Sequence, residues 1–475
     1  MSPFASTQDL AVHLTALPDR EVAALLVARP DLASPPSSSF LALATRAGTQ
    51  GSVEQALAGL DASTLAAAEA VVALSRLDES GEAEGIGSTE AAEDGRAGGA
   101  VGIGGEPADD GPVGDPADNP VGADLAGLIA ARLPLETEQV TEALDRLSRL
   151  ALVIEGRPVA ALEAAFGPHP FGLGPWAAEP LSAEQLPPTL EELSEDVARG
   201  AGEPIVPTAS VEMLQALTWG PPAGTLRSGG KVPGAAPLIE HRWLERSSDA
   251  RGRTRFILPR QVALALRGGR LTREPLTAPE AGDLETVGAD VVASEASFHT
   301  EEAVRLVAAL LEEWGREGGT IRRTGGVSAR TLARTADALD LETDSAARII
   351  EIAAGAGLLG LDDDGATWVP SSLAAGWLTD SLPQRWAPLA LAWSGSARTP
   401  WLTGTRDDDG TLRAALGPDL EAGWAARLRA RVLALLGDLP PGTSATPAFV
   451  RAVLTWRSPR RTIPGGAISA VLAEA

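Results

Sequence analysis

The chain repeats one unit, in which an apolar-periodic helix is followed by a short strand, a tight turn and a second strand. The clearest copy ends in LGLDDDGATWVP, residues 359–370. A second copy ends in HRWLERSSDARGRTRFILP, residues 241–259, and a shorter one is VTEALDRLSRLALVIEGRPV, residues 140–159. Helices followed by a two-stranded wing are typical of the winged-helix variant of the helix-turn-helix. The repeat therefore predicts a mainly α fold with small β-hairpin wings, arranged as tandem winged-helix units joined by irregular connectors.

Length and periodicity predict several domains, because 475 residues exceed the usual size of one. The chain ends in ISAVLAEA, which we interpret as the start of a helix in a truncated unit. The predicted segments are an N-terminal helical segment (1–51), a first winged helix (52–166), a connector (167–205), a second winged helix (206–273), a linker (274–298), a third winged helix (299–380) and a helical C-terminal unit (381–475).

The negative charge is concentrated in one segment. Of a net charge of −25, residues 78–124 contribute −12, from 13 acidic residues against Arg96. This stretch is rich in Gly and Pro and has few large apolar residues, so it cannot bury enough surface to offset its ordering entropy. We expect a disordered acidic insertion in the first winged helix. A solvated spacer is the favoured interpretation, and an electrostatic mimic of DNA is the alternative.

Arginine clusters elsewhere along the chain. Residues 241–273 hold nine Arg against two acids, and residues 427–461 hold seven Arg against Asp438. Guanidinium groups neutralise phosphates, so the clusters predict DNA contacts. The alternative is that Arg stands in for Lys, which occurs only at Lys231, on ordinary solvated faces and in internal ion pairs. The candidate DNA-binding residues are Arg251, Arg253, Arg255, Arg260, Arg322, Arg323, Arg330, Arg334, Arg457, Arg460 and Arg461.

These arginines are expected to contact phosphates rather than bases. Base edges are often recognised by Asn or Gln, but Gln261 is the only such side chain within the clusters, and Asn119 in the acidic stretch is the only Asn of the sequence. Binding without sequence preference is therefore predicted.

Catalytic motifs are absent from the sequence. The segment GTLRSGGK (224–231) resembles a phosphate loop but has one residue too many, and Val232 replaces the Ser or Thr that would ligate Mg²⁺. Two DDDG runs, 362–365 and 407–410, are interpreted as solvated turns. We therefore predict no enzyme activity, no cofactor and no metal site. The four His are isolated and have no Cys to join them: His13, His169, His241 and His299.

The compartment is predicted from what the sequence lacks. It has no Cys, no signal peptide at MSPFASTQDL and no apolar run near the roughly 20 residues that span a bilayer. We expect a soluble cytoplasmic protein with no membrane partner, associated with the nucleoid if it binds DNA. Its oligomeric state is not predicted.

Several long strings carry a family resemblance. LDASTLAAAEAVVAL, FGPHPFGLG, ILPRQVALALRGG, RTGGVSARTLARTADALDL and WVPSSLAAGWL occur in this order along the chain. With them the chain resembles an actinobacterial family described as helicase-associated, XPB-like domain-containing or DNA-binding proteins. The resemblance covers most of the chain except the acidic insertion. Family members continue beyond this length, and their helicase-like part lies in that continuation. The resemblance thus implies an N-terminal, non-catalytic portion.

Two functions fit the sequence, and we predict the first, because the family resemblance and the charges of the wings agree. In the first, tandem winged helices with Arg-rich wings bind DNA in repair or transcription. In the second, the same units form a protein-interaction scaffold that docks a helicase or another nucleic-acid enzyme, with no direct DNA contact, and the overall acidity keeps it off bulk DNA. Arginines that converge on one face would favour DNA binding. Arginines dispersed among Asp and Glu partners would favour the scaffold.

Overall fold

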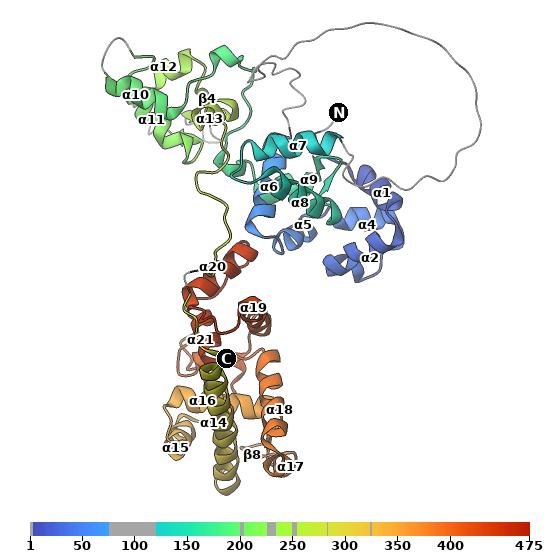
Figure 1. The fold of residues 1–475 in the computed structure, drawn as a ribbon, viewed down its shortest axis with the longest axis vertical. Coiled ribbons are helices and arrows are strands. Elements are labelled where there is room, and N and C mark those ends of the chain that lie inside the picture. The colour runs from blue at the N-terminus through green and yellow to red at the C-terminus, as the bar shows by residue number, and fades with distance from the viewer. Residues whose placement is uncertain are drawn as a thin grey trace, which may run out of the picture. The chain divides into compact units, whose positions relative to one another are not determined.

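The computed structural model describes residues 3–75, 120–199, 204–225, 234–248, 254–282, 284–323 and 325–475 (Figure 1). The chain forms two compact units. Unit 1 comprises Met1–Thr277 with Arg457–Arg460, and unit 2 comprises Ala278–Trp456 with Arg461–Ala475. Both are mainly helical with small antiparallel sheets, which confirms the predicted fold class. Most of the predicted acidic insertion lies outside the described residues.

The first part of unit 1 is a helical array with one small hairpin. Helix α6 buries nine of its residues, because almost all of its positions are Ala, Val or Leu, and it packs against α8. Glu155 and Gly156 have positive φ angles of 50° and 76° and form the predicted turn of the hairpin. The elements are α1 (Thr7–Ala16), α2 (Asp19–Ala28), α3 (Pro30–Ala33), α4 (Phe40–Ala47), α5 (Gln50–Leu57), α6 (Ala62–Leu74), α7 (Pro120–Ala130), α8 (Thr137–Arg149), β1 (Val153–Ile154), β2 (Arg157–Pro158) and α9 (Ala160–Phe166).

The N-terminal segment 1–51 is not separate from the first predicted winged helix. Leu10 and Leu14 of α1 belong to the same buried core as Val53. The backbone N–H of Ala5 donates to the carbonyl of Pro158 at 2.9 Å, so the first residues bond to strand β2. The apolar stripes of short helices need a surface to cover them, and this core supplies it.

The second part of unit 1 contains a three-stranded antiparallel sheet in the order β3-β5-β4, followed by a short helix as predicted. The predicted connector 167–205 was wrong in one respect, since it holds helix α10. Thr189 caps this helix, because its hydroxyl accepts from the N–H of Glu192 and its own N–H donates to the Glu192 carboxylate. The elements are α10 (Leu190–Arg199), α11 (Thr208–Thr218), β3 (Ala223–Thr225), α12 (Ala235–Glu240), β4 (Glu245–Ser248), β5 (Thr254–Ile257) and α13 (Arg260–Leu266).

Unit 2 begins with a helix–strand–helix–helix–hairpin series whose three strands pair in the order β6-β8-β7. Helix α14 packs against α16 and α18 (Figure 1). Its Trp314 is 1 % exposed in their shared core. The series comprises α14 (Ala289–Arg316), β6 (Gly319–Thr320), α15 (Ala329–Leu339), α16 (Thr343–Gly355), β7 (Leu359–Leu361) and β8 (Thr367–Pro370), followed by α17 (Ala374–Thr379) and α18 (Leu382–Gly395).

Two predicted boundaries in unit 2 were misplaced. Helix α14 begins at Ala289, inside the predicted linker 274–298. The prediction missed its first three turns because they are exposed and lack the apolar periodicity of a helix that packs on a core. Helix α18 lies beyond the predicted boundary at 380, yet its Leu389 is buried in the same core as Trp314.

The last helices of unit 2 form a smaller core. They are α19 (Ala425–Asp438), α20 (Pro447–Arg457) and α21 (Ala467–Glu474), and Val432, Val450 and Ile468 meet in their interior. The Thr446 hydroxyl accepts from the N–H of Phe449 at 3.2 Å, and Pro447 opens α20, as predicted.

Candidate nucleic-acid and protein interfaces

The wing β4–β5 carries part of the first Arg cluster. Arg251 and Arg253 lie outside the described residues. Arg255 is half-buried in β5, where it pairs with Ser247 of β4. Arg246 in β4, which was not a candidate, is exposed on the same wing. The described part of this hairpin is therefore basic.

Arg260 is an interior residue, and its prediction as a DNA contact was wrong. Its side chain is 7 % exposed, and its guanidinium donates to the carbonyls of Gly174 at 3.0 Å and Ala73 at 2.8 Å. It also lies 5.3 Å from the Trp176 ring. A guanidinium with these partners has no donor face left for a phosphate.

The cluster at the start of the third predicted unit is divided between paired and free side chains. Arg334 forms an ion pair with Glu317 at 2.7 Å and lies 3.6 Å from Glu313. Arg322 donates to the carbonyl of Leu412 at 3.0 Å. Both guanidinium groups are therefore engaged within unit 2. Within the part of the chain that the structure describes, the exposed side chains of Arg323 and Arg330 have no ion-pair partner.

The C-terminal cluster is also engaged. Arg460 belongs to unit 1. Its guanidinium donates to the carbonyl of Ala165 at 3.0 Å and lies 4.7 Å from the Phe166 ring. Arg457 and Arg461 are exposed, but each already takes part in interactions. Neither is a free phosphate contact.

The candidates that stay accessible are divided between the two units. Arg255 belongs to unit 1, whereas Arg323 and Arg330 belong to unit 2. Many other arginines pair with acids, as Arg398 does with Glu351 at 2.9 Å. Arginines that pair with acids, such as Arg398 and Arg334, favour the scaffold.

In unit 2, helix α16 and the β7–β8 hairpin that follows it expose acidic side chains. Glu342 and Asp344 are exposed at the start of α16. Asp363 and Asp364 are exposed in the β7–β8 turn, where Gly365 has a φ of 64°. The carboxylate of Asp362 accepts the N–H groups of Ala366 and Thr367, and these hydrogen bonds lower its pKa. This confirms the predicted DDDG turn.

The corresponding surface of unit 1 is acidic as well. Helix α8 precedes the β1–β2 hairpin and exposes Glu138, Glu142 and Asp145 against one exposed cation, Arg149. The Glu155 side chain in the hairpin turn is 75 % exposed. Phosphates are repelled by such a surface, whereas a basic protein surface is attracted.

Exposed apolar side chains are the features that sequence reasoning missed. Val291 is 47 % and Phe298 is 62 % exposed on the first turns of α14, and Trp386 is 42 % exposed on α18. Single exposed apolar residues are common, but Val291 and Phe298 are seven residues apart on one helix and so share a face, which makes that face a candidate interaction surface.

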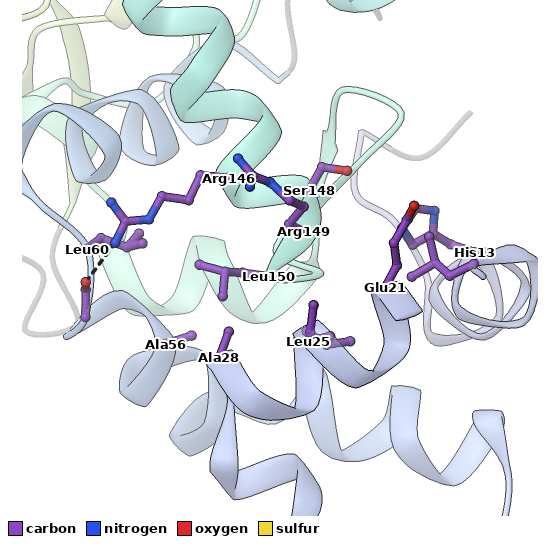
Figure 2. A pocket seen from close by; sticks show the side chains of 13 residues that line it. His13, Glu21, Leu25, Ala28, Ala56, Leu60, Arg146, Ser148, Arg149 and Leu150 are labelled. Carbon is purple, nitrogen blue, oxygen red and sulfur yellow. Dashed lines mark hydrogen bonds between the residues drawn. The ribbon is translucent and has the colours of Figure 1, made fainter. Parts of the chain in front are cut away.

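Unit 1 also contains a cavity of about 360 Å³, which the sequence did not predict (Figure 2). Its apolar floor includes Leu25 and Leu150, Arg146 and Arg149 form one wall, and His13 lies at one end. Burial lowers the pKa of His13, although the nearby carboxylates of Glu155 and Glu21 oppose that shift. The cavity can hold a small apolar group.

Arg146 in this wall is already bonded. It pairs with the Asp61 carboxylate. It also donates to the carbonyl of Gly59 at 3.2 Å (Figure 2). Arg149 is exposed and donates only weakly, to the carbonyl of Asp145 at 3.3 Å. The wall therefore offers one available cation.

No group of three or more His, Asp or Glu side chains that could hold a metal ion occurs among the described residues. In the same residues, no helix combines the length and apolar character needed to cross a bilayer. The resemblance to helicase-associated proteins stays a prediction, since no family model, no curated protein and no solved structure matches the chain.

Proposed function

We propose that this chain is a non-catalytic protein-interaction scaffold, built from winged-helix units, that docks a helicase or another nucleic-acid enzyme without holding DNA itself. The connectivity of unit 2 supports the winged-helix assignment, because a helix-turn-helix pair (α15 and α16) is followed by the β7–β8 hairpin, and β6 completes the sheet.

The acidity of the recognition surfaces carries this proposal. Carboxylates stand where a DNA-binding winged helix needs cations, at the start of α16, in the β7–β8 turn and along α8. Like-charge repulsion opposes the approach of a polyanion to such a surface. Because no phosphate is neutralised there, no counterions are released and binding gains no free energy from their release. A protein partner with a basic surface fits the same charges.

The test separates protein from DNA. We expect the full chain to show no saturable binding of labelled duplex, forked or single-stranded DNA in fluorescence anisotropy near physiological salt. We expect the immobilised chain to retain basic nucleic-acid enzymes from a nuclease-treated extract, and Glu342→Gln with Asp344→Asn to weaken retention. Asp419→Asn, an exposed acid outside these surfaces, is the matched control. Retention that disappears after nuclease treatment would contradict the scaffold.

A second candidate, DNA binding through the wing β4–β5, is favoured by one observation. Arg246 and Arg255 lie on a hairpin whose neighbouring acid, Glu245, already accepts the N–H of Ala178 at 2.9 Å. The predicted contacts Arg251 and Arg253 adjoin it in sequence. If this wing holds phosphates, Arg246→Ala and Arg255→Ala each weaken binding equally on all DNA sequences and reduce the salt slope by roughly one.

A further inference from the structure

The first three turns of α14 are not packed against any other described part of unit 2. All of residues 289–299 are exposed. Isolated helices of this length are marginal in water, and most helical stability in proteins comes from packing of an apolar face. Val291 and Phe298 are seven residues apart and therefore lie on one face of the helix. This face carries apolar side chains that nothing in the described part of unit 2 covers.

The same face leads into a groove. Arg305 and Glu312 continue the seven-residue spacing from Phe298, and both line a groove of about 510 Å³ between α14 and α18. The groove also contains apolar side chains, with Val304 at 2 % exposure in its floor and Leu382 on the α18 side. Trp386 lies one turn beyond Leu382 on α18. Apolar side chains thus occur on the first turns of α14, in the groove and at Trp386 of α18.

The rim of this surface has an excess of acid. Glu302 is neutralised by Arg305 at 2.6 Å, and Glu312 by Arg316 at 3.4 Å. Asp290 and Glu301 have no ion-pair partner among the described residues, and Glu295 faces only His299 at 3.6 Å. The uncompensated charge is therefore negative along the exposed turns.

We propose that the face of Val291 and Phe298, together with the α14–α18 groove, binds an amphipathic helix with basic flanks from a partner protein. Its apolar residues, at i, i+3, i+4 and i+7, cover Val291, Phe298 and the groove floor, and its Lys or Arg side chains meet Asp290, Glu295 and Glu301. A second copy of α14 does not fit, because its own flanks repeat the same acids. This inference rests on the proposed scaffold and names its docking surface and partner class.

The test uses the full chain and three synthetic peptides of about 24 residues, which match the length of α14 between the exposed turns and the far end of the groove, residues 289–312. The probe places Leu at i, i+3, i+4 and i+7 and Lys elsewhere. One control scrambles this sequence so that it has no apolar face, and the other replaces every Lys with Glu. We expect the probe alone to bind with measurable affinity in anisotropy at moderate salt.

Substitutions then locate the site. Phe298→Ser and Val291→Ser are expected to weaken probe binding about tenfold each, as buried apolar anchors do. Both positions are exposed, so the variants fold. Val12→Ser, at a position that is 61 % exposed in unit 1, is the matched control and is expected to leave binding unchanged. Equal binding of the scrambled peptide, or unchanged binding by Phe298→Ser, would overturn the proposed site.

The two proposals fail differently. If a natural partner retained by the chain is retained equally by the Phe298→Ser variant, the scaffold stands and this docking surface is wrong. If the chain retains no protein after nuclease treatment, the scaffold fails. Loss of retention by Phe298→Ser, with Val12→Ser unaffected, supports both.

Discussion

Buried arginines act as interior hydrogen-bond donors in both units. Arg29 is 1 % exposed and donates to the carbonyls of Leu150 and Ala47, which are far from it in sequence. Arg267 does the same with Thr218 and Phe171, and burial lowers its pKa to about 10. A guanidinium has five N–H donors, so one side chain can satisfy carbonyls from several loops.

The ion pair of Arg429 and Glu474 is the most deeply buried of these sites. Both side chains are 1 % exposed, with 2.9 Å between Nη2 and Oε2, and Trp393 Nε1 also donates to Glu474. Arg429→Met leaves a buried carboxylate without its cation, so we expect a loss of about 3 kcal/mol or more in the free energy of unfolding. Urea denaturation of the full chain measures this.

Arg427 on the same helix supplies the control. Its side chain is exposed, and Arg427→Met is expected to change stability by less than about 0.5 kcal/mol. Replacing both partners, Arg429→Met with Glu474→Leu, is expected to recover much of the loss, because no unpaired charge is then buried. Equal effects of the Arg429 and Arg427 variants would show that the pair does not stabilise unit 2.

Glu69 gives unit 1 a pH dependence. Burial raises the pKa of Glu69 above its ordinary 4.5, although the N–H of Phe171 and the charge of Arg460 act in the opposite direction. The folded state therefore holds this proton more tightly than the unfolded state. The stability it contributes is full below pH 4.5 and is lost as the pH rises through the raised pKa.

Glu69→Gln removes this dependence, since the amide stays neutral and can still accept from Phe171. We expect the variant to gain stability relative to the wild type between about pH 4.5 and neutral pH, measured as the difference between their urea midpoints. Glu69→Leu, which leaves the Phe171 N–H without its acceptor, is expected to destabilise at every pH. A constant difference for Glu69→Gln would contradict a raised pKa.

The sequence could locate the arginine clusters but not their roles. Arg260 and Arg323 both lie in clusters of like charge, and only the fold places one against Ala73 and Gly174 and leaves the other exposed. The chain has only one Lys, so Arg occurs both in the interior and on exposed faces. The residue type alone therefore does not distinguish a buried cation from an exposed one. Segments distant in sequence decide which guanidinium is buried.

Strand β6 has no room for a side chain at its first residue, Gly319. A Cβ on Gly319 would lie 2.8 Å from the Trp314 ring, which is rigid and buried in the core of unit 2. We expect Gly319→Ala to destabilise the protein by about 1–3 kcal/mol, because Trp314 or the strand must move. Thermal unfolding followed by circular dichroism measures the change.

Gly376 in α17 is the matched site. A Cβ there meets nothing within 4 Å, so Gly376→Ala is expected to stabilise the helix by about 0.5–1 kcal/mol. Opposite signs for the two substitutions are the expected result. Destabilisation by both would mean that Gly376 is more confined than its surroundings indicate.

Hairpins were easier to predict than the ends of helices. The turns at Gly156 and Gly365 were located because Gly adopts positive φ angles there, which is a local property of the sequence. The start of α14 was missed because Val291 and Phe298 are exposed and give no core periodicity. Helix α10 was missed because the Pro-rich stretch before it concealed the cap at Thr189.

At the scale of the whole molecule, the buried residues fall into separate cores. One core lies in unit 1, and two lie in unit 2, around Trp314 and around Val432. A unit with its own core unfolds cooperatively by itself, so the chain need not unfold in one step. We expect scanning calorimetry of the full chain to resolve at least two transitions.

Variants in the two units assign these transitions. Arg260→Met leaves the carbonyls of Ala73 and Gly174 without a donor, so it is expected to lower the midpoint of the transition that belongs to unit 1. Arg429→Met is expected to lower a different one, because its partner Glu474 lies in unit 2. If both variants shift one common transition, the two units unfold together. A substitution that destabilises unit 1 would then also lower the stability of the docking surface in unit 2.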